Sequence, residues 1–232
     1  TGYEALKSNS TGQYNTAIGS SAAKGTTGSN NSALGYAALL NNTGNGNTSV
    51  GSISMQSTGT GTNNTAVGYS SLNANTSGGN NVAIGVNSLT SSIDGYYNVS
   101  VGQDALYSNA HNDQNTAVGY RAGYQNSGNY SVFIGNQAGY YETGSNKLFI
   151  DNTTRSSEAD ARVKAMIYGV FSANMQSQIL TVNSILKIQP MTVTTANLIT
   201  PQEGMIIFVS NTDATFTSIG LWSYQNGAWH AL

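Results

Sequence analysis

The amino-acid sequence predicts an all-β fold: a parallel β-roll, or β-solenoid, of 16–17-residue repeats, followed by a β neck and a small C-terminal β-domain. Three observations predict it. A glycine recurs at a nearly constant spacing, the residues before it alternate with the period of a β-strand, and Gly, Asn, Ser and Thr dominate the composition. Such a chain turns often, and its backbone N–H and C=O groups pair in regular hydrogen-bond ladders.

The repeat is defined by its glycines. They recur every 16 or 17 residues, at Gly2, Gly19, Gly35, Gly51, Gly68, Gly85, Gly102, Gly119 and Gly135. A final half-repeat over residues 146–151 keeps the 16-residue step and places Asp151 where the glycine would stand. A constant period of this length is typical of stacked repeat architectures, so we expect residues 1–151 to form one array.

Each repeat joins a short strand-like segment to a turn-rich loop. The consensus before the glycine is Asn-Thr-Ala-Val/Ile, as in residues 15–18, 64–67 and 115–118. Ala or Ser stands three residues after the glycine and is usually followed by Leu. Period-2 alternation puts Thr and Val/Ile on one face and Ala on the other. We expect the Val/Ile face, which includes Val67, to be buried, and the small face to allow another layer to approach closely.

The strand-like segment is too short for a helix or an independent hairpin, so we expect the repeats to stack as coils by parallel β-pairing. At about 4.8 Å a coil, the array makes a rod of roughly 40 Å. Its interior is thin and two-layered, and it buries few apolar side chains. Association with other copies of the chain would bury more apolar surface.

The repeat Asn-Thr-Ala-Val-Gly-Tyr-x-(Ala/Ser)-Leu resembles the head repeats of trimeric autotransporter adhesins of the YadA type. It is also similar to related repeats in phage tail fibres and in surface proteins of Bacteroidetes-like bacteria. The resemblance covers residues 1–151 and implies a left-handed parallel β-roll, a homotrimer with three chains side by side, and a role in attachment. The repeats are longer here than those usual in the adhesin heads.

Charged residues become frequent after the array, at Arg155, Glu158, Asp160, Arg162 and Lys164. Solenoids need polar caps that stop end-to-end stacking, so we expect residues 152–200 to form a capped neck. Within it, residues 179–188 are expected to form strands with a turn. The only prolines of the chain, Pro190 and Pro201, bracket the start of the last unit.

Residues 201–232 predict a small β tip domain. Residues 204–209 form an apolar, strand-like run, and residues 221–230 have the pattern of a hairpin. Asn226-Gly227 in the middle of this hairpin is a preferred sequence for a type I′ turn. This ending resembles the small β-domain that closes many phage and bacterial fibres.

Composition argues against several classes of partner. Charged residues make up 8% of the chain, its net charge is −2 and it has no basic cluster, so nothing favours nucleic-acid binding. No run of about 18 apolar residues is long enough for a membrane helix, so we expect no membrane insertion. The chain has no cysteine, which excludes disulfides and cysteine-rich metal sites. We expect no cofactor.

The sequence predicts no enzyme. A glycosidase needs two carboxylates close together, and residues 25–93 hold no charged side chain at all. Three aspartates follow, at Asp94, Asp104 and Asp113. Asp104 and Arg121 stand in the same register on successive coils, where stacked opposite charges explain them more simply than catalysis does. His111 and His230 lack metal-ligand spacing to a second candidate, so we expect no metal site.

Tyrosines mark the first candidate binding site. Tyr107, Tyr124 and Tyr140 each follow a repeat glycine by five residues on successive coils, which predicts an aromatic stack. The stack serves either as a stabilising ladder, which we favour, or as a sugar-binding strip. Another group, Tyr3, Tyr36, Tyr69 and Tyr120, stands one residue after the glycine. These four do not fall on adjacent coils, and we give them less weight.

The second candidate site is the C-terminal tip, where the aromatic residues and a histidine gather as Trp222, Tyr224, Trp229 and His230. Aromatic faces beside polar groups commonly hold glycans, so a cell-surface glycan or protein receptor is the expected partner. The alternative is that both tryptophans fill the core of the small domain.

These observations favour an extracellular structural and adhesive fibre. Neither heptads nor membrane-anchor strands of the autotransporter type follow the array, which favours a segment of a phage or phage-like tail fibre that attaches to a host surface. The alternative is a bacterial cell-surface trimeric adhesin. A polysaccharide-degrading tailspike would need a carboxylate pair. An ice-binding solenoid would need a regular threonine row, but the row of Thr16, Thr48, Thr65 and Thr116 is interrupted by Ser32, Val82 and Val99.

Overall fold

The structure is a computed structural model that describes residues 1–57, 59–174, 177–183, 206–209 and 220–231. The chain divides into two compact units, Thr1–Asn183 and Ser184–Leu232. The division at residues 151 and 200 that the sequence suggests stays a prediction.

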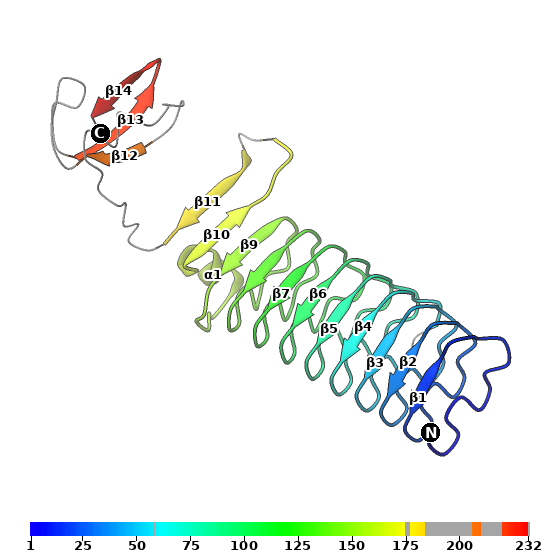
Figure 1. Ribbon diagram of the computed structural model, residues 1–232. Coiled ribbons are helices and arrows are strands. Elements are labelled where there is room, and N and C mark those ends of the chain that lie inside the picture. The colour runs from blue at the N-terminus through cyan, green and yellow to red at the C-terminus, as the bar shows by residue number, and fades with distance from the viewer. Residues whose placement is uncertain (58, 175–176, 184–205, 210–219, 232) are drawn as a thin grey trace. The chain divides into compact units, whose positions relative to one another are not determined.

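The first unit contains the predicted parallel β-solenoid, which the structure confirms (Figure 1). One three- or four-residue strand from each coil pairs in parallel with the strand of the next coil, as in Thr65↔Val82 and Ala66↔Ala83. The array strands are β1 (Thr16–Ile18), β2 (Ser32–Leu34), β3 (Thr48–Val50), β4 (Thr65–Val67), β5 (Val82–Ile84), β6 (Val99–Val101), β7 (Thr116–Val118), β8 (Val132–Ile134) and β9 (Lys147–Ile150).

The repeat glycines form a column at the end of these strands. Gly68 has a φ of +136°, and a Cβ added to it would lie 2.5 Å from the carbonyl oxygen of Gly85 in the next coil. A side chain would therefore meet both a disfavoured backbone conformation and a clash. This close approach explains why the register holds glycine in one coil after another.

After the glycine, each coil continues as a chain of turns instead of a second strand. Ser70 and Leu72 both have positive φ, at 56° and 50°. Their N–H groups donate in opposite directions, from Ser70 to the Ser52 carbonyl of the preceding coil (3.1 Å) and from Leu72 to the Ser88 carbonyl of the next coil (2.9 Å). The turn layer is thus tied to both of its neighbours, as the strand layer is.

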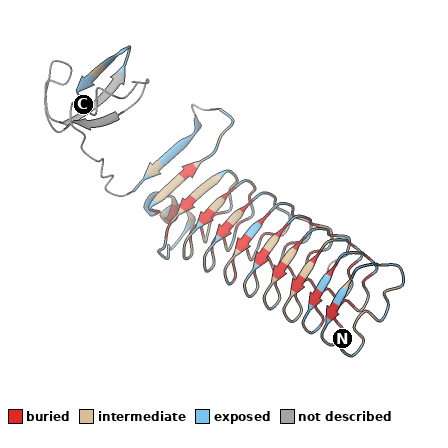
Figure 2. Cartoon of the chain, in the orientation of Figure 1, coloured by how far each residue is buried: buried red, intermediate tan, exposed pale blue. Residues whose placement is uncertain are grey.

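The Ala face of the strands, not the Val/Ile face, lines the interior. Ala66 is fully buried, whereas Thr65 and Val67 beside it are only half-buried. The other array strands likewise bury one residue each (Figure 2). The expectation that the face of Val67 is the buried one is therefore wrong for the single chain. The turn layer lies so close to the strands that one small strand residue and one Leu from the turn layer, such as Leu72, fill the space between them.

A ladder of buried asparagines runs along one edge of this interior. The Asn that opens the consensus accepts through Oδ1 from the backbone N–H of its counterpart in the next coil, as Asn47 does from Asn64 (2.9 Å) and Asn64 from Asn81 (3.0 Å). Through Nδ2, Asn64 donates to the Gly78 carbonyl (2.9 Å). The amide satisfies backbone groups that would otherwise be buried without partners, which explains why the repeat carries Asn there.

The predicted polar cap follows the last coil. Helix α1 (Glu158–Lys164) is capped at its N-terminus by Ser157, whose side chain accepts from the N–H of Asp160. Strand β10 (Ile167–Val170) then pairs antiparallel with β9, and β11 (Ile179–Val182) pairs antiparallel with β10 (Figure 1). The sheet of the first unit therefore ends in two antiparallel strands. Of the strand region predicted over 179–188, residues 184–188 lie outside the described residues.

The second unit contains an antiparallel sheet of β12 (Ile206–Val209), β13 (Gly220–Gln225) and β14 (Ala228–Ala231). Asn226 and Gly227 both have positive φ, at 52° and 77°, as a type I′ turn requires. The predicted hairpin is confirmed.

Candidate binding surfaces

The tyrosine stack predicted on the second half of the array is confirmed. The ring centroids of Tyr107 and Tyr124 lie 5.0 Å apart with planes 12° from parallel, and those of Tyr124 and Tyr140 lie 4.8 Å apart at 4°. Tyr141 packs edge-on against Tyr140 at 4.6 Å. Burial raises the pKa of the Tyr124 hydroxyl. The inner ring faces cover one another and are closed to a sugar, which supports the stabilising interpretation of the stack.

Arg121 lies beside this stack but is already paired. Its guanidinium carbon is 4.9 Å from the ring centroid of Tyr120 and 5.5 Å from that of Tyr124. Nε donates to Oδ2 of Asp104 one coil earlier (3.3 Å), and this hydrogen bond raises the pKa of Arg121. The predicted stack of opposite charges is therefore confirmed. Because the pair is neutral, the site offers little attraction to an anionic ligand.

The remaining polar candidates on the array do not converge on a ligand. His111 Nδ1 lies 2.7 Å from Oδ1 of Asp94 one coil earlier, and both side chains are exposed. Asp113 accepts from the backbone N–H of Tyr96 (2.7 Å). Among the described residues, no group of three His, Cys, Asp or Glu side chains could hold a metal ion.

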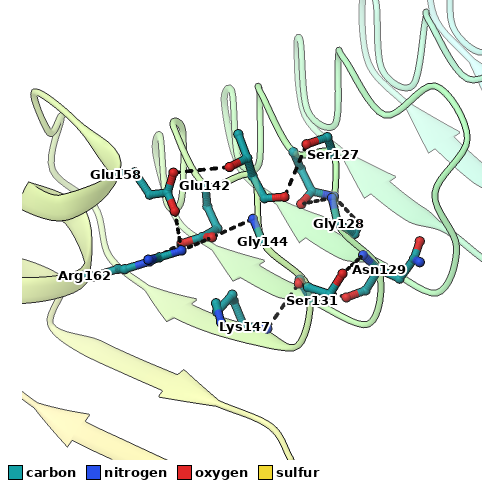
Figure 3. A network of polar contacts seen from close by, with 12 residues as sticks. Ser127, Gly128, Asn129, Ser131, Glu142, Gly144, Lys147, Glu158 and Arg162 are labelled. Carbon is teal, nitrogen blue, oxygen red and sulfur yellow. Dashed lines mark hydrogen bonds and ion pairs between the residues drawn. The ribbon is translucent and has the colours of Figure 1, made fainter.

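A charged network that the sequence analysis did not identify closes the last coil (Figure 3). Glu142 is fully buried and accepts from the N–H of Gly144 (2.8 Å). Arg162 of α1 donates to the same carboxylate through Nε (2.9 Å) and Nη2 (2.7 Å), which raises the pKa of Arg162, and it also forms an ion pair with Glu158. All of these contacts hold the cap on the array, so the network is structural.

The sequence does carry a signal for this network. Glu142 stands seven residues after Gly135, a register that holds a buried amide in other coils, as at Asn126. Oδ1 of Asn126 accepts from Gly128 N (3.2 Å) just as Glu142 accepts from Gly144 N. Replacement of this amide by a carboxylate in the last coil indicates a cationic partner arriving from outside the array.

At the tip, strand register separates the four predicted residues. Tyr224 pairs with Trp229, and Trp222 stands two residues before Tyr224, so these three positions share one face of the hairpin. His230 lies on the opposite face, where Nε2 is 3.1 Å from the Gln225 carbonyl oxygen. Trp229 is half-buried and His230 is exposed, whereas the side chains of Trp222 and Tyr224 lie outside the described part. Binding at the tip stays a prediction.

A long apolar surface follows the strands of the array, and we call it the outer strip. It consists of the last residue of each of the strands β1–β8, which points away from the interior and is aligned coil by coil. Its most exposed members are 40–48% exposed and comprise Ile18, Leu34, Ile84, Val118 and Ile134. No charged residue occurs in β1–β8. Contiguous exposed apolar surface is a feature that protein–protein interaction sites share.

Comparison with known proteins assigns no role to these surfaces. No known protein family, curated protein or solved structure matches the chain. Within the described part, the structure contains no helix that is both long and apolar enough to span a membrane.

Proposed function

We propose that this chain is a segment of an extracellular, homotrimeric attachment fibre. The outer strip carries the proposal. It is apolar, uncharged over β1–β8 and exposed along a body whose own interior holds little more than Ala, Ser, Asn and at most one large apolar residue per coil. A chain with so thin an interior gains much stability by covering such a strip.

A second copy of the same chain is the occupant that fits best. Each coil repeats the same outward side chain at the same rise, so another copy can match the strip coil for coil. A three-fold axis parallel to the stacking direction lets each strip face the other two and keeps equivalent ends together. The resemblance of the repeat to YadA-type heads and phage tail fibres supports this arrangement.

Attachment is the role that suits such a body. The array from residue 25 to residue 93 bears no charged side chain and repeats the same surface, which suits a spacer. The aromatic hairpin at 220–231 is not repetitive, and three copies of it would add avidity to weak individual contacts. In a tail fibre the three hairpins would bind bacteria, and in a bacterial adhesin they would bind animal cells or extracellular matrix.

The test is a binding assay with the labelled full chain on Gram-negative bacteria, Gram-positive bacteria, animal cells and immobilised collagen. A matched chain lacking residues 184–232 ends at the boundary between the two units and keeps the array and its cap. Specific binding to bacteria supports the tail fibre, and binding to animal cells or collagen supports the adhesin. If the full chain binds none of the four surfaces, the attachment role is wrong; if the shortened chain binds at full strength, the tip is not the receptor site.

A further inference from the structure

A column of exposed tyrosines runs along the first half of the array, one residue after the repeat glycine. Tyr3, Tyr36 and Tyr69 stand on every second coil and are 77%, 59% and 54% exposed. Ser20 and Ser52 hold the same position on the coils between them. The hydrogen bonds that align the column run from Ser21 N to Tyr3 O (2.8 Å), Ala37 N to Ser20 O (3.0 Å), Ile53 N to Tyr36 O (2.8 Å) and Ser70 N to Ser52 O (3.1 Å).

The spacing of this column leaves gaps the size of one ring. Coils rise by about 4.8 Å each, so neighbouring tyrosines of the column stand roughly 9.6 Å apart along the array. Where tyrosines occupy consecutive coils instead, at Tyr124 and Tyr140, their rings stack 4.8 Å apart. With their rings oriented like those of Tyr124 and Tyr140, two column tyrosines would place a flat ring halfway between them at stacking distance from both. One gap lies above Ser20 and the other above Ser52.

The chemistry of the gaps selects the kind of ring. Each gap lies between two exposed tyrosine positions, with a half-buried serine between them, so aromatic and hydroxyl groups are available together. A pyranose ring has matching parts, an apolar C–H face and peripheral hydroxyls. The gap between Tyr36 and Tyr69 belongs to the uncharged stretch 25–93, which supplies no cation for a phosphate or a carboxylate. A neutral sugar fits these features, and a nucleotide does not.

We propose that the column of Tyr3, Tyr36 and Tyr69 binds a neutral glycan, with one pyranose ring between each pair of tyrosines. The site uses other residues than the C-terminal hairpin and the stack of Tyr107, Tyr124 and Tyr140. It deepens the proposed attachment role by naming a ligand class, and it rests on that role only for its biological purpose, because the binding itself is a property of the array.

The experiment measures binding of maltohexaose, cellohexaose and N-acetylchitohexaose to the full chain by saturation-transfer NMR and calorimetry. We expect at least one to bind with a millimolar or lower Kd. Tyr36→Ala removes an aromatic contact from both gaps and should weaken binding about tenfold, which corresponds to about 1.4 kcal/mol. Tyr36→Phe should bind within about threefold of the parent. Tyr14→Ala, at an 82%-exposed tyrosine outside the column, is the matched control and should change nothing.

Ser52→Tyr provides the decisive variant, because it places a third ring between Tyr36 and Tyr69. It should reproduce the stack of Tyr107, Tyr124 and Tyr140, raise the melting temperature and abolish binding in that gap. The proposal is overturned if the parent binds none of the three sugars at millimolar concentration, or if Tyr36→Ala and Ser52→Tyr bind as well as the parent. It is also overturned if Tyr36→Ala dissociates the oligomer, because the column would then be a chain–chain contact. Loss of sugar binding with assembly and cell attachment intact would leave the proposed function standing.

Discussion

Phe133 occupies the space that a side chain at Gly139 would need: a Cβ at position 139 would lie 2.2 Å from Cδ1 of Phe133. In most coils the corresponding strand position holds a small residue and the corresponding turn-layer position holds a leucine, as at Ala83 and Leu89. The coil of Gly135 reverses the two sizes, with Phe133 on the strand and Gly139 in the turn layer. Phe133 stacks on Phe149 at 6.0 Å, and the aromatic series continues to Tyr168 in β10, so the interior changes composition where the cap begins.

This exchange predicts strong coupling between Phe133 and Gly139. Gly139→Leu should destabilise the chain by about 3 kcal/mol or more through overpacking, and Phe133→Ala by about 3–5 kcal/mol through a cavity. The double variant restores the Ala and Leu of the other coils, and Leu89 shows that leucine accepts positive φ at this register. In denaturant unfolding, the double variant should lose at least about 1 kcal/mol less unfolding free energy than the two single variants lose together. Additive losses would show that the two positions do not share one space.

The cap predicts a second coupled pair. Arg162→Met leaves the buried carboxylate of Glu142 without its cation and should cost about 3 kcal/mol in unfolding free energy. The equivalent residue of the preceding coil is Asn126. Adding Glu142→Asn to the Arg162→Met chain therefore removes the unpaired buried charge and should recover part of the lost stability. Thermal and denaturant unfolding of the two variants provide the measurement. An Arg162→Met chain as stable as the parent would mean that the ion pair does not hold the cap.

The two faces of a strand predict opposite results for neighbouring substitutions. Ala66→Asp places a carboxylate in the closed interior without a partner and should prevent folding, at a cost of several kcal/mol. Val67→Asp places it on the outer strip, so the chain should keep its circular dichroism spectrum but fail to assemble. Circular dichroism and sedimentation of both variants test this. An unfolded Val67→Asp chain would contradict the observed assignment of faces.

Helix α1 predicts a dependence on acid. Hydrogen bonds from Lys164 and from the N–H of Ser156 hold the pKa of Asp160 below its usual value of 3.8. A carboxyl group whose pKa is lower in the folded chain contributes stability above its unfolded pKa and loses it as pH falls through the folded pKa. The contribution of Asp160 should therefore be complete above about pH 4 and fade below it. Melting temperatures of the parent and of Asp160→Asn should differ at neutral pH and converge in strong acid; a constant difference would exclude this linkage.

The period of the repeat made most of the fold predictable. Constant spacing of residues such as Gly68 and Gly85 dictates stacked coils, and equal register predicts both the Tyr124–Tyr140 stack and the Asp104–Arg121 pair. These contacts follow from sequence because residues one period apart in a solenoid are neighbours in space.

Other features depend on the turn layer, which repeats with the coils but has no strand-like alternation of its own. Alternation alone shows that Ala66 and Val67 face opposite ways, but not which of them faces inward. That choice depends on the turn layer, where residues such as Leu72 take positive φ and bring the two layers close together. The pair of Glu142 and Arg162 was missed because it joins the array to a helix whose path breaks the period.

The most direct test of the homotrimeric fibre is the mass of the chain in solution. Sedimentation velocity and native mass spectrometry at sub-micromolar concentration should give three chains of 24.1 kDa, about 72 kDa in all, in an elongated particle. Under the same conditions, the Val67→Asp variant should sediment as a folded single chain. A parent chain that is folded and stable at 24.1 kDa under the same conditions would contradict the trimer and leave the outer strip without its proposed occupant.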